Sequence, residues 1–276
     1  MAESDPDLSN SFGGAILHEP QPYVPSNPIH ENDIERLLSV ESEVMEGSWS
    51  RVKKTKDAEV WRRDSNEEGF PPITKAVLQL EDVPFKKVVK LMTDWKLRQE
   101  WDKTAAVVDV LDRIGNFKVV YNRLKMPLFC TKRDAVLASL ERYDSDQHCY
   151  ILALRSTEHP LIQETQKSSF VRAETILSGT IIRPVGDGSQ SSTVTIITQM
   201  KLKGSAPQFI KNSYLAGSPV KRMQLLKKFY IKHQGDEDSN LSLSGSDKDI
   251  KMSPFTSPKK PKSTSSTGGS IDNVMD

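Results

Sequence analysis

Residues 204–232 read GSAPQFIKNSYLAGSPVKRMQLLKKFYIK. Ser205 can cap a helix, Pro207 suits a first helical turn, and large apolar residues then recur mainly three or four positions apart. These apolar residues are Phe209, Ile210, Tyr214, Val220, Met223, Leu226 and Tyr230. The pattern predicts one long C-terminal helix with an apolar face. A kink is expected at Gly217-Ser218-Pro219, because proline lacks an amide hydrogen and clashes with the preceding turn.

The sequence before this helix is dominated by strand patterns. A short amphipathic helix is predicted from about Asn32 or Asp33, followed by three strands near 50–54, 58–63 and 73–81. Two short helices fit residues 84–102. Six further strands are expected at 107–111, 117–121, 135–140, 149–154, 170–182 and 194–200. We therefore predict an α+β fold with about nine antiparallel strands and a long last helix.

The two ends of the chain differ in composition from this central part. Five of the 16 prolines fall within residues 1–29, and residues 234–276 hold ten serines and three threonines. Neither segment has enough apolar residues to offset the entropy lost on ordering. We expect a folded domain over residues 31–233, a disordered leader over 1–30 and a disordered Ser-rich tail over 234–276.

Composition and motifs exclude several classes of function. Lys and Arg number 38 against 37 Asp and Glu, so the net charge of +1 gives no general attraction to nucleic acid. No apolar run is long enough to span a bilayer, and the acidic start does not resemble a signal peptide, so we expect a cytoplasmic protein. The two cysteines and five scattered histidines lack metal spacing, and no nucleotide or nucleophile motif is present. We expect no cofactor, no metal and no enzymatic activity.

One local charge feature stands out near the C-terminus. Between Asp187 and Asp236 there is no acidic residue, whereas eight Lys and Arg residues occur there. Four of them, Lys221, Arg222, Lys227 and Lys228, are candidate contacts with an anionic membrane surface. The alternative that they form only the solvated face of a surface helix remains open.

The Ser-rich tail contains candidate phosphorylation sites. Ser253 and Ser257 each precede a proline, and Ser244 and Ser246 each have an acidic residue three positions later. A phosphate adds about 1.5 to 2 negative charges, so it could compete with a membrane for the basic helix.

Six short motifs stand out along the central part of the chain. They are Arg98-Gln99-Glu100-Trp101-Asp102, Tyr121 to Pro127, Lys132-Arg133-Asp134, His159-Pro160, Val171-Arg172-Ala173-Glu174 and Lys203-Gly204-Ser205-Ala206-Pro207. START (StAR-related lipid-transfer) domains carry similar motifs in the same order, so the chain resembles the START family, and most of all its phosphatidylcholine-transfer-protein group. The resemblance implies the helix-grip fold, in which a curved antiparallel sheet wraps the last helix around an apolar tunnel. It also implies a monomeric intracellular carrier that binds one lipid, a glycerophospholipid, and exchanges it between membranes through peripheral membrane contact.

The resemblance also implies a lipid site. Arg98 and Asp102 stand where members of the group contact the phosphocholine head, although four-residue spacing equally allows a simple ion pair on a helix face. Further residues expected at the cavity are Met92, Tyr121, Leu137, Phe209, Tyr214 and Met223. The positions that enclose choline in the phosphatidylcholine-specific member correspond to Met92, Asn122, Ala135 and Leu137. None is aromatic, so we expect a headgroup preference that is broader than choline or different from it.

Three alternatives remain open at this stage. The protein could be a lipid-sensing adaptor whose tails bind partners, without bulk transfer. Arg133 and Asp134 could form structural salt bridges between strands. His159-Pro160 lies in the polar connection from Ser156 to Ser169, which the resemblance makes a gate of the tunnel but which could equally be an ordinary exposed loop.

Overall fold

The structure is a computed structural model that describes residues 23–126, 130–162, 169–186, 190–205 and 207–234. Within these ranges the elements are, in order, α1 (Glu31–Ser42), β1 (Ser50–Lys54), β2 (Ala58–Arg63), β3 (Ile73–Leu80), α2 (Phe85–Thr93), α3 (Trp95–Trp101), β4 (Ala105–Ile114), β5 (Phe117–Leu124), β6 (Lys132–Asp144), β7 (Cys149–Ser156), β8 (Phe170–Arg172), β9 (Glu174–Pro184), β10 (Ser192–Lys201) and α4 (Gln208–Lys232). The four candidate phosphorylation serines lie outside the described residues.

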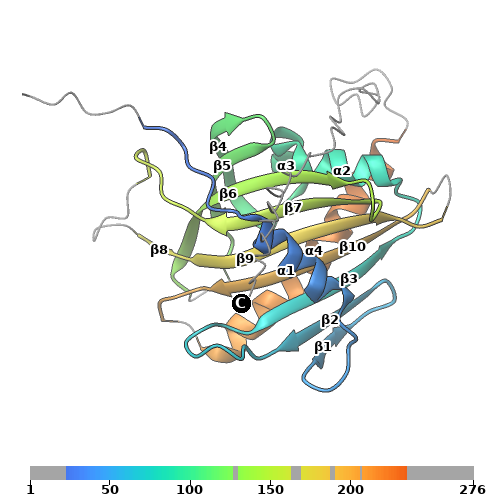
Figure 1. The fold of residues 1–276 in the computed structure, drawn as a ribbon, viewed down its shortest axis with the longest axis horizontal. Helices are drawn as coiled ribbons and strands as arrows, with labels where there is room; N and C mark the ends of the chain where they lie inside the picture. The colour runs from blue at the N-terminus through green and yellow to red at the C-terminus, as the bar shows by residue number, and fades with distance from the viewer. Residues whose placement is uncertain (1–22, 127–129, 163–168, 187–189, 206, 235–276) are drawn as a thin grey trace, which may run out of the picture.

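One sheet of ten strands organises the domain, which confirms the predicted α+β helix-grip class. Its strand order is β1-β2-β3-β10-β9-β7-β6-β5-β4, and β8 pairs with β6. All the described pairs are antiparallel except β6 with β8. Figure 1 shows α1 lying across one face of this sheet and α4 behind it.

The predicted strand 170–182 is divided in the structure. Residues Phe170–Arg172 form β8 and run parallel to β6, whereas Glu174–Pro184 form β9 and run between β7 and β10. The division falls at Ala173, whose amide donates to the carbonyl of Asp134 at 2.8 Å. This stretch of β-type sequence therefore forms two strands: β8 pairs with β6, and β9 pairs with β7 and β10.

Helix α1 packs on one face of the sheet and forms the first apolar core with it. Gly179 of β9 makes room for the helix, because a Cβ there would lie 2.5 Å from a methyl carbon of Leu37. The helix end is held by Lys75 of β3, whose Nζ donates to the carbonyls of Val40 at 2.9 Å and Glu43 at 3.1 Å. Burial lowers the pKa of Lys75, against the raising effect of nearby acidic groups.

Helices α2, α3 and α4 close the opposite face and form a second apolar core. Val220, Met223 and Leu226 of α4 are at most 3% exposed there. They pack in one cluster with inward residues of β2, β3, β9 and β10. Helix α4 runs unbroken from Gln208 to Lys232 with Pro219 inside it, which confirms the predicted long last helix.

The domain begins earlier than residue 31. Ile29 is 4% exposed and belongs to the core beneath α1. The hydroxyl of Tyr23 donates to the carbonyl of Glu158 at 3.4 Å, and its ring lies 5.0 Å from that of His159. Residues 23–30 are thus part of the packed structure, and the predicted disordered leader is wrong for them.

Candidate functional site

A buried cluster of charged residues joins α3 to α4. On α3, Nε of Arg98 lies 3.1 Å from Oδ2 of Asp102, and Nε of Arg222 on α4 lies 3.2 Å from the same oxygen. The side chains of Arg98 and Asp102 are 4% and 0% exposed. Arg98 and Asp102 therefore form the ion pair that their four-residue spacing allows, and this pair is buried.

Local sequence places this cluster. Asp94 caps α3, since its carboxylate accepts from the amides of Lys96 and Leu97. Trp101 fixes the other end, because its Nε1 donates to the carbonyl of Leu91 at 3.0 Å. With both ends of the short helix held, Arg98 and Asp102 project together towards α4.

The cluster carries a net positive charge, because two guanidinium groups share one carboxylate. The pKa of Arg98 is lowered to about 10, because burial and the charge of Arg222 lower it more than Asp102 raises it. Burial alone would raise the pKa of Asp102, but Arg222, Arg98 and hydrogen bonds from Thr104 hold it at about 2. Arg98 and Asp102 are therefore both charged at neutral pH.

Two donors of this cluster form no hydrogen bond. Nη1 of Arg98 is buried without a hydrogen-bond partner among the described residues, and so is Nε of Arg222, although it lies 3.2 Å from Asp102. The same is true of Nε1 of Trp95 and Oδ1 of Asn122. The guanidinium of Arg98 lies over the Trp95 ring, with Cζ 4.7 Å from the ring centroid. Buried polar groups normally have partners, so this part of the interior can accept a polar ligand group.

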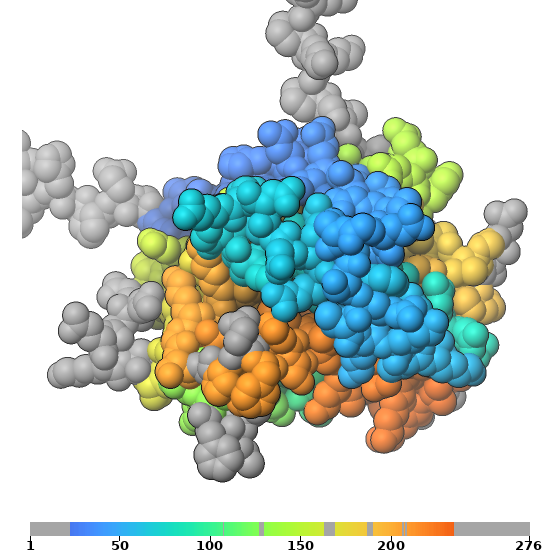
Figure 2. All heavy atoms as spheres, turned by 90° about the horizontal axis from the view of Figure 1, so that it is seen from below, coloured from blue at the N-terminus to red at the C-terminus, as the bar shows by residue number. Residues whose placement is uncertain are grey.

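A pocket of about 740 Å³ opens beneath the first half of α4. Its lining comes from β1, β2, β3, β10 and α4, together with the segments that precede β3 and α4, and consists of Val52, Lys53, Arg62, Pro71, Pro72, Thr74, Met200, Lys201, Leu202, Lys203, Lys211, Asn212, Ser213, Leu215, Ala216 and Gly217. The volume is typical of ligand pockets. Figure 2 shows this face of the molecule, where the orange start of α4 lies beside the blue and cyan residues of β1 to β3.

Comparison with known proteins identifies the family. The model of the START domain matches residues 31–231. The chain belongs to the START domain family.

Relatives of this START domain are similar over most of its length. Human "StAR-related lipid transfer protein 7, mitochondrial" is 23% identical over 250 residues, which cover 82% of this chain and 62% of that protein. Human "START domain-containing protein 10" is 25% identical over 210 residues, which cover 74% of this chain and 70% of that protein. The chain thus spans less than two thirds of the length of the first of these relatives.

Solved structures support the fold of this START domain. The crystal structure of human STARD10 superposes with a TM-score of 0.66 at 21% identity and covers 79% of this chain and 85% of its own. Human StAR-related lipid transfer protein 5 gives a TM-score of 0.65 at 18% identity, with 74% and 95% covered. At these identities the likeness concerns the fold alone.

The START domain buries three of the remaining predicted ligand residues and half-buries a fourth. Met92 and Met223 lie in the core between α4 and the sheet, and Leu137 is 5% exposed. Tyr214 of α4 hydrogen-bonds Ser218 and lies near Arg222 and Asp102; burial raises the pKa of its hydroxyl. None of the eight predicted ligand residues lines the 740 Å³ pocket.

Two predicted ligand residues do not face the interior beneath α4. Tyr121 packs with Phe117 and Val119 in the core on the α1 side, where its hydroxyl donates to Asp134 at 3.2 Å. Alternation along β5 instead turns Lys118, Val120 and Asn122 towards the α4 side. Phe209 is 72% exposed at the start of α4, since only residues further along the helix reach the sheet.

The four candidate membrane contacts on α4 separate into two groups. Lys221 and Lys228 are exposed and Lys227 is half-buried. Arg222 instead turns inward to Asp102, and only 20% of its side chain is exposed. Arg222 is therefore unsuited to the predicted membrane contact.

Asp134 forms a structural salt bridge between strands, as the alternative predicted, whereas Arg133 binds backbone carbonyls. Arg133 donates to the carbonyls of Leu202 at 3.2 Å and Lys203 at 2.9 Å, which holds the connection into α4. Asp134 accepts from Nε of Arg172 at 2.8 Å and ties β6 to β8.

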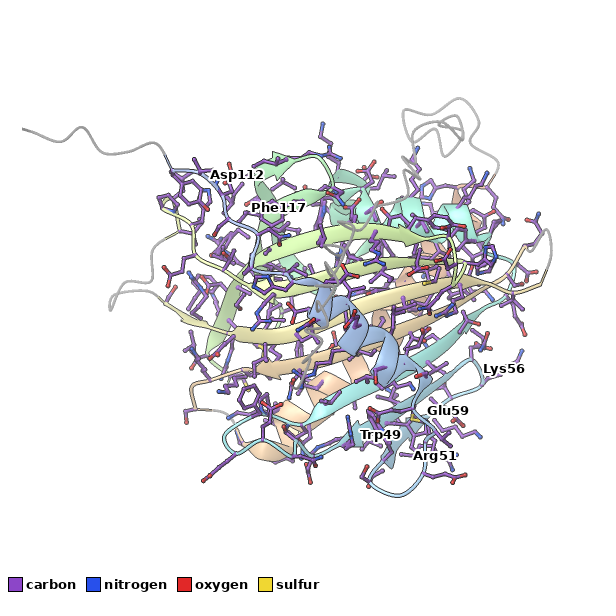
Figure 3. The ribbon with its side chains drawn as sticks, in the orientation of Figure 1. Trp49, Arg51, Lys56, Glu59, Asp112 and Phe117 are labelled. Carbon is purple, nitrogen blue, oxygen red and sulfur yellow. The ribbon has the colours of Figure 1, made fainter. Side chains whose placement is uncertain are left out.

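The side chain of His159 is buried rather than exposed. Its Nε2 lies 2.8 Å from Oδ2 of Asp112, which Figure 3 labels on β4, and its Nδ1 accepts from the amide of Leu161 at 3.2 Å. A ring nitrogen that accepts from an amide is unprotonated, so Nε2 carries the hydrogen and donates to Asp112. His159 thereby fixes the segment after β7 to β4.

Sequence reasoning missed a second buried polar group on the α4 side. Lys118 of β5 is only 3% exposed, forms an ion pair with Glu141 and donates to the carbonyl of Thr93 at 3.3 Å. Tyr150 donates to Glu141 at 3.1 Å, and burial strongly raises its pKa. A lysine at an inward position of a strand was the available signal.

Two further possibilities find no support in the described residues. No group of three or more His, Cys, Asp and Glu side chains there could hold a metal ion. No helix of the described ranges has both the length and the apolar character needed to cross a bilayer.

Proposed function

We propose that this START domain binds one glycerophospholipid in its interior and exchanges it between membranes as a carrier rather than an enzyme. The observation that carries the proposal is the buried guanidinium of Arg98, whose Nη1 has no partner among the described residues and whose cluster has net positive charge. A buried charge without full hydrogen bonding is costly unless a ligand compensates it. A phosphodiester supplies the negative charge and the acceptor oxygens that a guanidinium binds best.

The acyl chains require an apolar enclosure. Two chains hold on the order of 30 methylenes, and each costs about 0.8 kcal/mol to expose to water. The lipid must therefore pass from bilayer to protein without crossing free water. The pocket beneath the first half of α4 is the entrance that we propose, and the printed names of the relatives support a role in lipid transfer.

We further propose transient contact with anionic membranes from the cytoplasmic side. Lys221, Lys227 and Lys228 of α4 are available for such contact. Five basic residues also line the pocket, namely Lys53, Arg62, Lys201, Lys203 and Lys211. Basic residues near an anionic surface each contribute about 1 kcal/mol, which suffices for reversible attachment.

Two measurements on the full-length chain test the carrier function. Mass spectrometry of lipids that copurify with the protein should reveal one phospholipid class at about one molecule per chain. Transfer of a labelled phospholipid from donor to acceptor vesicles should rise in proportion to protein concentration. Retention without transfer would favour the lipid-sensing adaptor, and the absence of any retained lipid would refute both functions.

A further inference from the structure

Three unpartnered polar atoms lie in one corner of the interior. Trp95, Arg98 and Asn122 are 6%, 3% and 7% exposed. Nε1 of the first, Nη1 of the second and Oδ1 of the third are buried and have no hydrogen-bond partner among the described residues. Buried polar atoms without partners are rare in folded proteins, so three of them together indicate a polar group that the protein is built to receive.

A chain of contacts places the three residues together. The guanidinium of Arg98 lies 4.7 Å from the centroid of the Trp95 ring. Trp95 packs in one cluster with Val120 of β5 and Val108 of β4. Asn122 follows Val120 by two positions, so both side chains lie on the same face of β5, and Asn122 is the direct partner of Val108 in the β4–β5 pairing. Asn122 therefore lies beside Val108 and Val120, the two residues that pack against Trp95.

The chemistry of these atoms specifies a ligand. The guanidinium of Arg98 and the indole N–H of Trp95 donate, which suits phosphate oxygens. Oδ1 of Asn122 accepts, which suits a headgroup that carries a donor a few bonds from its phosphate. A trimethylammonium group has no N–H and would bury this acceptor without a partner. One face of the Trp95 ring is already covered by Arg98, so it is not free to receive a quaternary ammonium.

We propose that Asn122 is a specificity-determining residue, which selects phospholipids whose headgroup ends in a hydrogen-bond donor, a primary ammonium above all, over choline lipids. This inference rests on the proposed lipid-carrier function. It concerns the headgroup beyond the phosphate and does not depend on how the protein meets the membrane.

A methylation series tests the proposal on the full-length chain. The protein is incubated with vesicles that contain equal amounts of phosphatidylethanolamine, its N-methyl and N,N-dimethyl derivatives and phosphatidylcholine, all with the same acyl chains. Protein-bound lipid is then quantified by mass spectrometry. The bound fraction should fall along the series, with the steepest drop at the third methyl group, where the last N–H disappears. The expected ratio of the first lipid to the last is about tenfold, equivalent to about 1.4 kcal/mol.

Variants separate the role of Asn122 from a general effect on binding. Asn122→Leu should bring the ratio close to one, because it removes the acceptor oxygen that distinguishes the headgroups. Ser139→Ala is the matched control, because its Oγ is also buried and unpartnered but lies opposite Lys118, away from Trp95; it should keep the wild-type ratio. Should Asn122→Leu fail to fold by circular dichroism, Asn122→Val replaces it.

Each result has a defined meaning. A wild-type ratio at or below one, or an unchanged ratio in the Asn122 variant, overturns the inference while leaving the carrier function intact. If the wild-type protein binds none of these lipids, both the carrier function and the inference are overturned. A parallel sample contains phosphatidylglycerol, whose headgroup offers hydroxyl donors without positive charge. We expect phosphatidylglycerol to bind more weakly than phosphatidylethanolamine. Stronger binding of phosphatidylglycerol would refute the preference for an ammonium group.

Discussion

At the scale of single residues, the central feature is that Asp102 serves two arginines. Arg98 and Arg222 both lie within 3.2 Å of its Oδ2, and the carboxylate is wholly buried. Removal of the carboxylate would leave the buried Arg98 and the half-buried Arg222 without their shared counter-ion, whereas removal of Arg98 leaves Arg222 paired with Asp102.

Asp102→Asn should therefore destabilise the domain strongly. Breaking a buried ion pair by removing one partner costs about 3–5 kcal/mol, and we expect a loss of this size in the free energy of unfolding. Arg98→Met should cost clearly less. Urea denaturation followed by tryptophan fluorescence measures both, and equal losses in the two variants would show that Asp102 is not the shared counter-ion.

The same carboxylate predicts a pH dependence of stability. The pKa of Asp102 is about 2 in the folded chain and 3.8 ordinarily, so the unfolded state binds its proton first as pH falls. The ionised Asp102 therefore adds to the free energy of unfolding above pH 4. About 2 kcal/mol of this stability is lost as the pH falls towards 2, at 1.36 kcal/mol per pKa unit. Unfolding titrations between pH 5 and pH 2 should show this loss in the wild type. In Asp102→Asn the free energy of unfolding should fall less steeply between pH 5 and pH 2. If both proteins show the same dependence on pH, Asp102 is not the group responsible.

At the scale of elements, α4 has two halves with different surroundings. Val220, Met223 and Leu226 pack in the core, whereas the residues from Lys211 to Gly217, except Tyr214, line the pocket. The first half makes fewer apolar contacts with the core, which lowers the free energy needed to open it locally. Its amide hydrogens should therefore exchange faster than those of the second half.

Hydrogen exchange with and without lipid tests this division. Bound phospholipid should protect the amides of residues 211–217 and change those of residues 222–230 much less. Mass spectrometry of peptic fragments resolves the two halves within one sample, so the second half is an internal control. Equal protection of both halves would argue against entry beneath the first half.

The elements themselves were largely predictable, and the site was not. Helical periodicity fixed α4, and alternation found most strands. The side of the sheet on which a residue lies depends on partners that are remote in sequence, which explains the error at Tyr121. Arg222 turns inward because it contacts Asp102, 120 residues earlier in the sequence. The sequence near Arg222 does not show this contact, so the residue looks like one of the exposed basic residues of the helix. The split at Ala173 likewise depends on a contact with Asp134.

At the scale of the whole molecule, carriage requires a surface that meets membranes. The triple variant Lys221→Glu, Lys227→Glu, Lys228→Glu should weaken binding to anionic vesicles by roughly a hundredfold at low salt, given about 1 kcal/mol per lysine. Cosedimentation measures this affinity. Lys54→Glu, Lys56→Glu, Arg113→Glu is a control of equal charge that alters exposed residues on or beside β1 and β4. If both triple variants lose affinity equally, net charge rather than the α4 surface governs attachment.

The whole account depends on a buried arginine that receives the phosphate of a lipid. Native mass spectrometry after incubation with phospholipid vesicles measures this directly, as the fraction of chains that carry one lipid. We predict nearly full occupancy for the wild type, a loss of at least tenfold for Arg98→Met, and little change for Lys118→Met, which removes a buried cation that already has protein partners. Equal occupancy of the wild type and Arg98→Met would contradict the account.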